Sequence, residues 1–242
     1  GHFAMTSYNQ GSNLMLAYQT ADNEILSLVR DGDGWRSGPT SVGHQTDGDI
    51  SLAALGPSLY LIHKVVGSQQ MNVVSYNTAP FNAVTVPTSQ WSGPYDNTTK
   101  DAWSPSGFPV AHFSHAANPV TPGEDEPVSQ PYQGSGPLVA AMLDGVVHLA
   151  HPGASNPLVL TETLSISGIM TPEKPVSYKS SDETTTSNGY GTLAEAGWSR
   201  QSAINGVYHR YGRMAMASLK SEVVLVFQPD DGGGIQICTS RY

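Results

Sequence analysis

The chain has 242 residues with 25 glycines and 17 prolines, and only 13% of its residues are charged. This length suits one sizeable all-β domain, and the absence of any run of about 20 apolar residues excludes a membrane-spanning helix. The net charge of −9 excludes a general nucleic-acid binder, which needs clustered basic side chains to neutralise phosphates. The single cysteine, Cys238, excludes an internal disulfide and is expected to be a small core residue.

A short apolar segment recurs four times along the chain and is predicted to be a strand each time. The copies are residues 14–19, 59–64, 147–152 and 224–229. A second strand-length run follows each copy, at 24–29, 71–76, 157–164 and 234–242. An apolar strand of small residues precedes three of the copies, at 52–55, 139–142 and 216–219, and residues 3–8 are the candidate innermost strand of the first unit.

A tryptophan in a Gly, Ser or Asp setting marks three of these units, at Trp35, Trp103 and Trp198. The order within a unit is then a Trp-bearing strand, an Ala-rich strand, the repeated strand and a closing strand. Four short strands per unit of about 45 residues are typical of a β-propeller. We predict an all-β chain that forms one β-propeller domain of four recognisable modules, with five blades as the alternative. The modules are 1–43, 44–102, 103–197 and 198–242.

The third module is longer than the others because of two insertions, 116–134 and 165–196, which are rich in Pro, Ser, Thr and acidic residues. We expect surface loops there, and the second insertion is the place where a degenerate fifth blade would lie. The last module has no Trp-bearing strand after it, and an open ring leaves unpaired strand edges. Residues near the N-terminus, or a second copy of the chain, are expected to supply that strand.

The start of the chain shows no basic and apolar pattern of a signal peptide, and residues 1–4 can derive from a cloning vector. The expected protein is soluble, and either cytoplasmic or secreted by a non-classical route.

Segment 16–26 and the Asp31-Gly32-Asp33-Gly34-Trp35 run after it resemble one blade of the fungal fucose-lectin propellers, and segment 227–236 is similar to the same blade. The resemblance implies sugar sites between blades. In that family an Arg on the repeated strand, a Glu on the next strand and aromatic walls hold the fucose. The chain departs from the family at this clamp: the Arg position falls on Met15, Tyr60, His148 and Leu225, and the Glu position falls near Ser27 and Ile237.

Aromatic and histidine side chains at repeated positions are the candidate ligand contacts. An indole ring suits the apolar face of a sugar, and His and Tyr can hydrogen-bond to hydroxyl groups. The alternative is structural: each Trp packs between adjacent blades, and each His that follows a Trp binds a neighbouring backbone. The candidate binding residues are Trp35, Trp103, Trp198, His44, His112, Tyr60, His148 and His151.

The sequence predicts no metal site, no cofactor and no catalytic residue. The two His-x-x-His pairs, at 112–115 and 148–151, would point to opposite faces of a strand and could not hold one ion. The acidic runs at 31–34 and 230–233 are predicted to be plain turns. The acidic residues that might form a glycosidase pair lie in the insertions, where a solvated loop is expected: Glu124, Asp125, Glu126, Asp182 and Glu183.

We predict a non-enzymatic carbohydrate-binding protein, a lectin that recognises glycans or glycoconjugates through shallow sites between blades. Several weak sites would supply avidity. Neither nucleic acid nor membrane insertion is expected, whereas a homo-oligomer could close the last blade. One alternative is an enzyme, either glycan-cleaving or a small-molecule lyase or cyclase, that uses the central funnel beneath the long insertions. Another is a protein-interaction or toxin receptor-binding propeller.

Overall fold

The computed structural model describes residues 1–8, 11–55, 58–77, 102–103, 108–114, 128–155, 158–165, 197–198, 202–208, 212–228 and 234–241. These residues form strands, turns and bends, with no helix among them. The prediction of an all-β chain is therefore confirmed. The described segments likewise include no helix of the length and apolarity that crossing a membrane requires.

The first sheet is antiparallel and follows the chain order. Its strands are β1 (Phe3–Tyr8), β2 (Asn13–Gln19), β3 (Glu24–Asp31), β4 (Gly34–Trp35) and β5 (Thr40–Gln45). Both β4 and β5 pair with β3, so together they form one interrupted outer strand. Buried and partly exposed residues alternate along β3, as expected for a strand with one face against a core.

The second and third sheets repeat this plan. The second contains β6 (Ile50–Leu55), β7 (Ser58–Lys64), β8 (Met71–Asn77), β9 (Ala102–Trp103) and β10 (Phe108–Pro109). The third contains β13 (Val139–Leu143), β14 (Val146–Pro152), β15 (Leu158–Ser165), β16 (Gly197–Trp198) and β17 (Ser202–Tyr208). In the second sheet β9 and β10 both pair with β8, and in the third sheet β16 and β17 both pair with β15. Two strands therefore share one outer edge in each of these sheets.

The fourth sheet has three strands in the described part of the chain, β18 (Met214–Leu219), β19 (Glu222–Phe227) and β20 (Gln236–Arg241). A separate hairpin, β11 (Ala111–Ser114) with β12 (Val128–Pro131), lies between the second and third sheets in sequence. Residues 128–134 at the end of the first insertion are thus partly strand. The rest of both insertions lies outside the described residues, and so do the five acidic residues named above and the predicted turn at 230–233.

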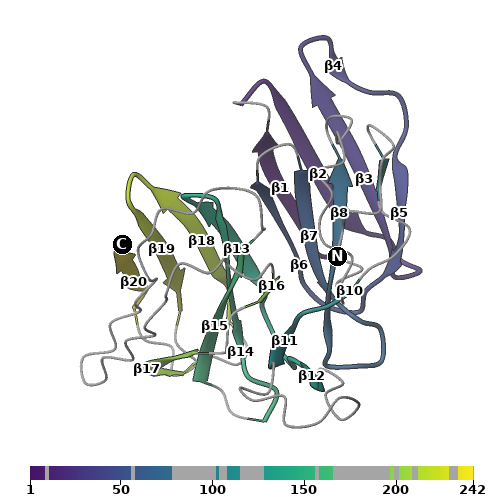
Figure 1. Ribbon diagram of the computed structural model, residues 1–242. Helices are drawn as coiled ribbons and strands as arrows, with labels where there is room; N and C mark the ends of the chain where they lie inside the picture. Colours follow the sequence, from purple (N-terminus) through teal and green to yellow (C-terminus); the bar gives the residue numbers. More distant parts are fainter. Residues whose placement is uncertain are drawn as a thin grey trace, which may run out of the picture.

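The four sheets follow one another in space in their chain order, from β1–β5 to β18–β20 (Figure 1). Their first strands β1, β6, β13 and β18 contact one another in that order. Radial sheets whose first strands gather about a common axis are the arrangement of propeller blades. No comparably extensive contact joins a strand of the fourth sheet to a strand of the first in the described part of the chain, so the sheets form an arc.

Hydrophobic clusters fill the spaces between neighbouring sheets, because successive side chains of a strand point to opposite faces. Leu59 and Leu61 of β7 pack in a cluster with the first sheet, whereas Tyr60 and Ile62 of the same strand pack in a cluster with the third. Two smaller clusters join the third sheet to the fourth, and Cys238 packs against one of them. The expected packing role of Cys238 is confirmed, although its side chain is only partly buried.

Two buried hydrogen bonds also tie neighbouring sheets together. Trp103 Nε1 of β9 donates to Ser27 Oγ of β3 at 2.9 Å, and Trp103 packs against Tyr76 with ring centres 5.1 Å apart. The backbone N–H of Ala140 in β13 donates to Ser51 Oγ of β6 at 2.8 Å. Each of these two bonds therefore satisfies a buried polar group across neighbouring sheets.

The predicted innermost strand at 3–8 is confirmed as β1, and each copy of the repeated segment is the second strand of a sheet. The order within a unit needs one correction. The Trp-bearing strands β9 and β16 pair with the sheets that precede them, so they come last in a sheet and not first. A cyclic repeat fixes the succession of strands but not which of them begins a sheet.

Candidate functional site

A pocket of about 550 Å³ opens between the first and second sheets, at the end where β3 begins and β7 ends. Its volume lies in the range of small-molecule sites. Hydrogen-bonding side chains from both sheets form most of its wall. The lining residues are Asp22, Glu24, Ser41, Gly43, His44, Gln45, His63, Val65, Val66 and Asn72.

A bulge in β5 places His44 in this pocket. Glu24 of β3 pairs with Gln45, but Leu26 pairs with Ser41, so β5 carries two extra residues over this step. Gly43 within the bulge has φ of +80°, a conformation that favours glycine, and Val42 is buried. Bulges re-aim side chains in this way next to functional sites.

His63 is the next-to-last residue of β7 and faces the same pocket, with a residue exposure of 1%. Its Nδ1 lies 3.0 Å from the carbonyl oxygen of Lys64. A carbonyl oxygen can only accept, so Nδ1 carries the hydrogen and Nε2 of the neutral ring presents a lone pair. Burial is the main cause that lowers the pKa of His63 to about 4, with the Lys64 carbonyl acting to raise the pKa and the nearby His44 acting to lower it.

The two imidazole rings lie close together, with ring centres 5.4 Å apart and planes inclined by 57°. Burial also lowers the pKa of His44, so both rings are neutral at neutral pH. The Nε2 atoms of both rings are buried, and neither has a hydrogen-bond partner among the described residues. Unpartnered buried nitrogens are uncommon in folded proteins and call for a physical explanation.

Carboxylate and hydroxyl groups add charge and hydrogen-bonding capacity beside the histidines. Ser41 Oγ donates to Glu24 Oε1 at 2.6 Å, which holds the carboxylate at the pocket wall.

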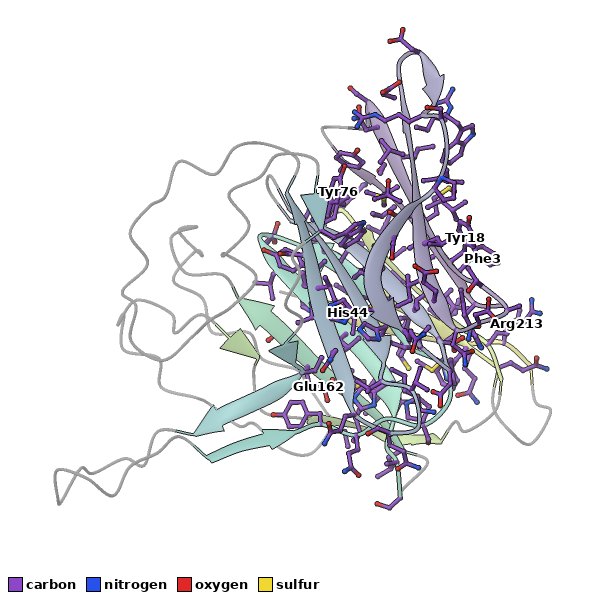
Figure 2. The ribbon with its side chains drawn as sticks, turned by 90° about the vertical axis from the view of Figure 1, so that its right-hand side faces the viewer. Phe3, Tyr18, His44, Tyr76, Glu162 and Arg213 are labelled. Atoms are coloured by element: carbon purple, nitrogen blue, oxygen red, sulfur yellow. The ribbon has the colours of Figure 1, made fainter. Side chains whose placement is uncertain are left out.

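Figure 2 shows His44 and Tyr76 at different levels of the interface between the first two sheets. The register of the second sheet agrees, since Tyr76 pairs with Leu59 at the start of β7 and Asn72 pairs with His63 near its end.

A second cavity, of about 850 Å³, lies where β1, β6, β13 and β18 begin. It is the mouth of the space enclosed by the first strands, and Figure 2 shows Phe3 and Arg213 of its wall on the same side of the molecule. His2 pairs with Asp49 at this mouth. Lys64 Nζ lies 3.3 Å from Asp47 Oδ1, so the rim carries charges of both signs.

The structure brings one of the predicted binding residues, His44, into the inter-sheet pocket. Trp35 is 50% exposed and lies at the opposite end of β3, paired with Arg30. His112 lies on the β11–β12 hairpin and Trp198 on β16, but their side chains lie outside the described residues. The prediction that these three contact a ligand stays a prediction.

Four predicted binding residues are buried in the interior of the protein. Trp103 is 8% exposed and bonds Ser27, which is the inter-blade packing considered as the alternative for tryptophans. Tyr60 lies in the cluster between the second and third sheets. His148 and His151 are buried on β14, where burial lowers the pKa of His148 to about 4. We leave these four residues out of the site proposed below.

The four positions that correspond to the Arg of the fucose clamp are in the interior: Met15, Tyr60, His148 and Leu225 are all buried. Ser27, at one Glu position of the clamp, accepts the buried hydrogen bond from Trp103 Nε1. The predicted plain turn at 31–34 is confirmed, since the Asp33 N–H donates to Asp31 Oδ1 at 3.1 Å.

Sequence reasoning missed His63, Glu24 and Asn72 as pocket residues. One signal was present for His63, which ends the second copy of the repeated strand. The position of Glu24 against His44 depends on the two-residue bulge, which no spacing in the sequence reveals.

The arrangement defines an all-β propeller-type fold with a polar pocket between adjacent sheets, and solved structures share the fold. AofleA from Arthrobotrys oligospora matches 99% of the chain with a TM-score of 0.51 at 11% identity, and a triple arginine-to-alanine mutant of it gives 0.52. The chain spans 53% of the AofleA chain, about half its length. The resemblance to fungal lectin propellers is confirmed at the level of the fold.

Two lectins are similar at lower TM-scores. The SapL1 lectin in complex with alpha methyl fucoside gives 0.48 at 12% identity, over 99% of this chain and 63% of that one. The six-bladed β-propeller lectin of Aleuria aurantia gives 0.41 at 11% identity, over 98% and 74%. No protein-family model matches the chain, and no curated protein matches it in sequence.

Proposed function

We propose that this protein binds carbohydrate, and that the pocket between the first two sheets holds a sugar unit. The polar lining of that pocket carries the proposal: seven of its ten lining residues have hydrogen-bonding side chains. Sugar hydroxyls both donate and accept hydrogen bonds. Glu24 and Asp22 accept from them, Asn72 and Gln45 do both, and Val65 and Val66 offer an apolar edge to the ring.

The fold supports this proposal, since the chain is similar to AofleA along nearly its whole length. We propose a non-enzymatic propeller in which each of the four sheets contains one copy of the repeated strand. The specificity is not that of a fucose clamp, because the Arg positions of the clamp are buried and the clamp positions carry neither Arg nor Glu.

A glycan array followed by titration of the bound glycans tests the proposal. Glu24→Gln should weaken binding by about 10- to 100-fold, since a hydrogen bond to a charged group contributes about 1.5–3 kcal/mol. Asn72→Ala should weaken it by about 2- to 10-fold, since a hydrogen bond between neutral groups contributes about 0.5–1.5 kcal/mol. Asp31→Asn, a change of an acidic residue in a turn outside the pocket, should bind as the parent protein does. No bound glycan on the array, or equal binding by all three variants, would contradict the assignment.

The mouth of the central space supports a second candidate, an enzyme that uses one asymmetric cavity. The observation in its favour is the larger volume there and the ion pairs at the rim. In that case Arg213→Ala would abolish binding and Glu24→Gln would leave it intact. The two variants therefore separate the inter-sheet site from the central one.

We also propose that a second copy of the chain covers the outer faces of the first and fourth sheets. Phe3 on β1 is 72% exposed and Ile237 on β20 is 64% exposed, and Met5 is exposed beside Phe3. Ala4 packs toward the second sheet, so Phe3 and Met5 lie on the opposite face of β1. The matching faces of the inner sheets are buried by their neighbours. Light scattering should show an oligomer that Met5→Lys weakens, and a monomer at high concentration would refute the contact.

A further inference from the structure

We propose that His44 and His63 bind a divalent first-row transition-metal ion such as Zn²⁺. The observation is the pair of buried Nε2 atoms that have no hydrogen-bond partner among the described residues. Neutral imidazole nitrogen is a ligand that Zn²⁺, Ni²⁺ and Cu²⁺ favour. The inference goes beyond carbohydrate binding and does not depend on it.

The spacing of the rings fits two ligands on one ion. An ion 2.0–2.1 Å from the Nε2 of each ring, at a tetrahedral angle, separates the ring centres by about 5 Å. The ring centres of His44 and His63 are 5.4 Å apart, and the 57° between their planes lets the two rings approach an ion from different directions. The ring centres therefore lie at the separation that two histidine ligands of one ion require.

The tautomer of His63 is already the one that a metal requires. Its Nδ1 donates to the Lys64 carbonyl at 3.0 Å, which leaves the lone pair on Nε2. Ligating histidines almost always make such a bond through the second ring nitrogen, and the bond fixes the ring orientation.

The third sheet provides an internal comparison that separates this pair from the structural role of the repeat. His151 is the next-to-last residue of β14, as His63 is of β7, and its Nδ1 lies 2.9 Å from the Pro152 carbonyl. There, however, Nε2 lies 2.9 Å from Glu162 Oε1. Glu162 pairs with Leu149 in the third sheet, and the same register in the second sheet puts Val74 opposite Leu61. His63 thus lacks the carboxylate of its counterpart and faces His44 instead.

The protein supplies two ligands, which leaves the remaining coordination positions to solvent or to a molecule in the pocket. No group of three or more His, Cys, Asp and Glu side chains fit to hold an ion occurs in the described segments. The carboxylates of Asp22 and Glu24 line the same pocket and add negative charge that favours a cation. An ion with open positions is the pattern of exchangeable sites, in contrast to closed structural sites.

The test uses the whole chain, freed of metal with a chelator and without any sugar. Titration with ZnCl2 by calorimetry should give one ion per chain, and CoCl2 should develop visible absorption bands of an imidazole-bound ion. His44→Gln and His63→Asn should each weaken the affinity by at least about 100-fold, because each removes a ligand. Asn at position 63 keeps a donor for the Lys64 carbonyl.

His2→Gln is the matched control, since His2 lies in the other cavity, and its affinity should equal that of the parent protein. Circular dichroism without metal checks that each variant folds, and His44→Gln decides the matter if His63→Asn does not. Absence of Zn²⁺ binding, equal binding by His44→Gln, or loss of binding in His2→Gln would overturn the proposal. These outcomes are read without sugar, so they stand apart from failure of the carbohydrate assignment.

Discussion

The buried ion pair of His151 and Glu162 gives a prediction that can be worked out in detail. His151 Nε2 lies 2.9 Å from Glu162 Oε1, and the two side chains are 2% and 0% exposed. Burial by itself lowers the pKa of His151, but the charge and hydrogen bond of Glu162 and the Pro152 carbonyl together raise it above its ordinary value. The folded protein therefore favours the protonated ring beside the carboxylate.

Glu162→Gln removes the negative charge at nearly constant volume. Breaking a buried pair from one side costs about 3–5 kcal/mol, because the remaining charge has lost its partner. For a chain of this length that cost lowers the melting midpoint by about 6–20 °C. Scanning calorimetry or thermal circular dichroism measures the change.

The pH dependence of the same pair has a definite sign. A pKa raised on folding gives a stabilisation that is complete below the unfolded value of about 6.5 and is lost as pH rises through the higher folded value. Melting of the parent protein should lose this increment as the pH rises above about 6.5 and through the higher folded value, and Glu162→Gln should not show the loss.

Two control variants test whether the loss of stability comes from the buried pair. Asp31→Asn breaks the exposed pair of Asp31 with Arg36, and we expect little change in stability. Replacing both buried partners, as His151→Leu with Glu162→Leu, should restore much of the stability, since apolar replacement of a buried pair is often neutral. A midpoint of Glu162→Gln within about 2 °C of the parent, or the same pH slope in both, would refute the reasoning.

Three further substitutions test the packing between the sheets and the bulge. Trp103→Phe removes the donor to Ser27 inside the core and should cost about 1–3 kcal/mol in urea unfolding, whereas Trp35→Phe on the surface should be close to neutral. Ser51→Ala leaves the Ala140 N–H buried without its acceptor and should also cost about 1–3 kcal/mol; an unchanged unfolding midpoint would show that the bond contributes nothing. Gly43→Ala meets open space but must adopt φ near +80°, so a loss of about 1–2 kcal/mol is expected, and an unchanged stability would mean that the bulge had rearranged.

The fold could be predicted because short apolar strands recur along the sequence in a regular order. Residues 3–8 were expected to be the innermost strand of the first unit and form β1, and the recurring segments located the second strand of every sheet. The sequence could not show whether the strands of Trp103 and Trp198 belong to the preceding or to the following sheet. A cyclic repeat has the same order of strands whichever strand is taken as the first.

The site was harder to predict because it is built by contacts across sheets. His44 was named as a candidate, but its partner in the pocket is His63, which belongs to the next sheet. The neighbouring sequence does not show that His63 lines a pocket and that His151 does not, since both occupy the next-to-last position of the repeated strand. The difference is made by Glu162 in one sheet and Val74 in the other, through strand register.

The hydrogen bonds between sheets also bear on how the chain reaches its native state. Hairpins such as β2–β3 and β18–β19 join neighbouring residues, whereas the bonds of Trp103 and Ser51 close segments of 76 and 89 residues. Local contacts form before those that close long loops, so each sheet should assemble early and the ties between sheets late. Substitutions at Trp103 or Ser51 should then speed unfolding and leave the folding rate nearly unchanged. The interactions between neighbouring sheets would then determine how long the protein stays folded.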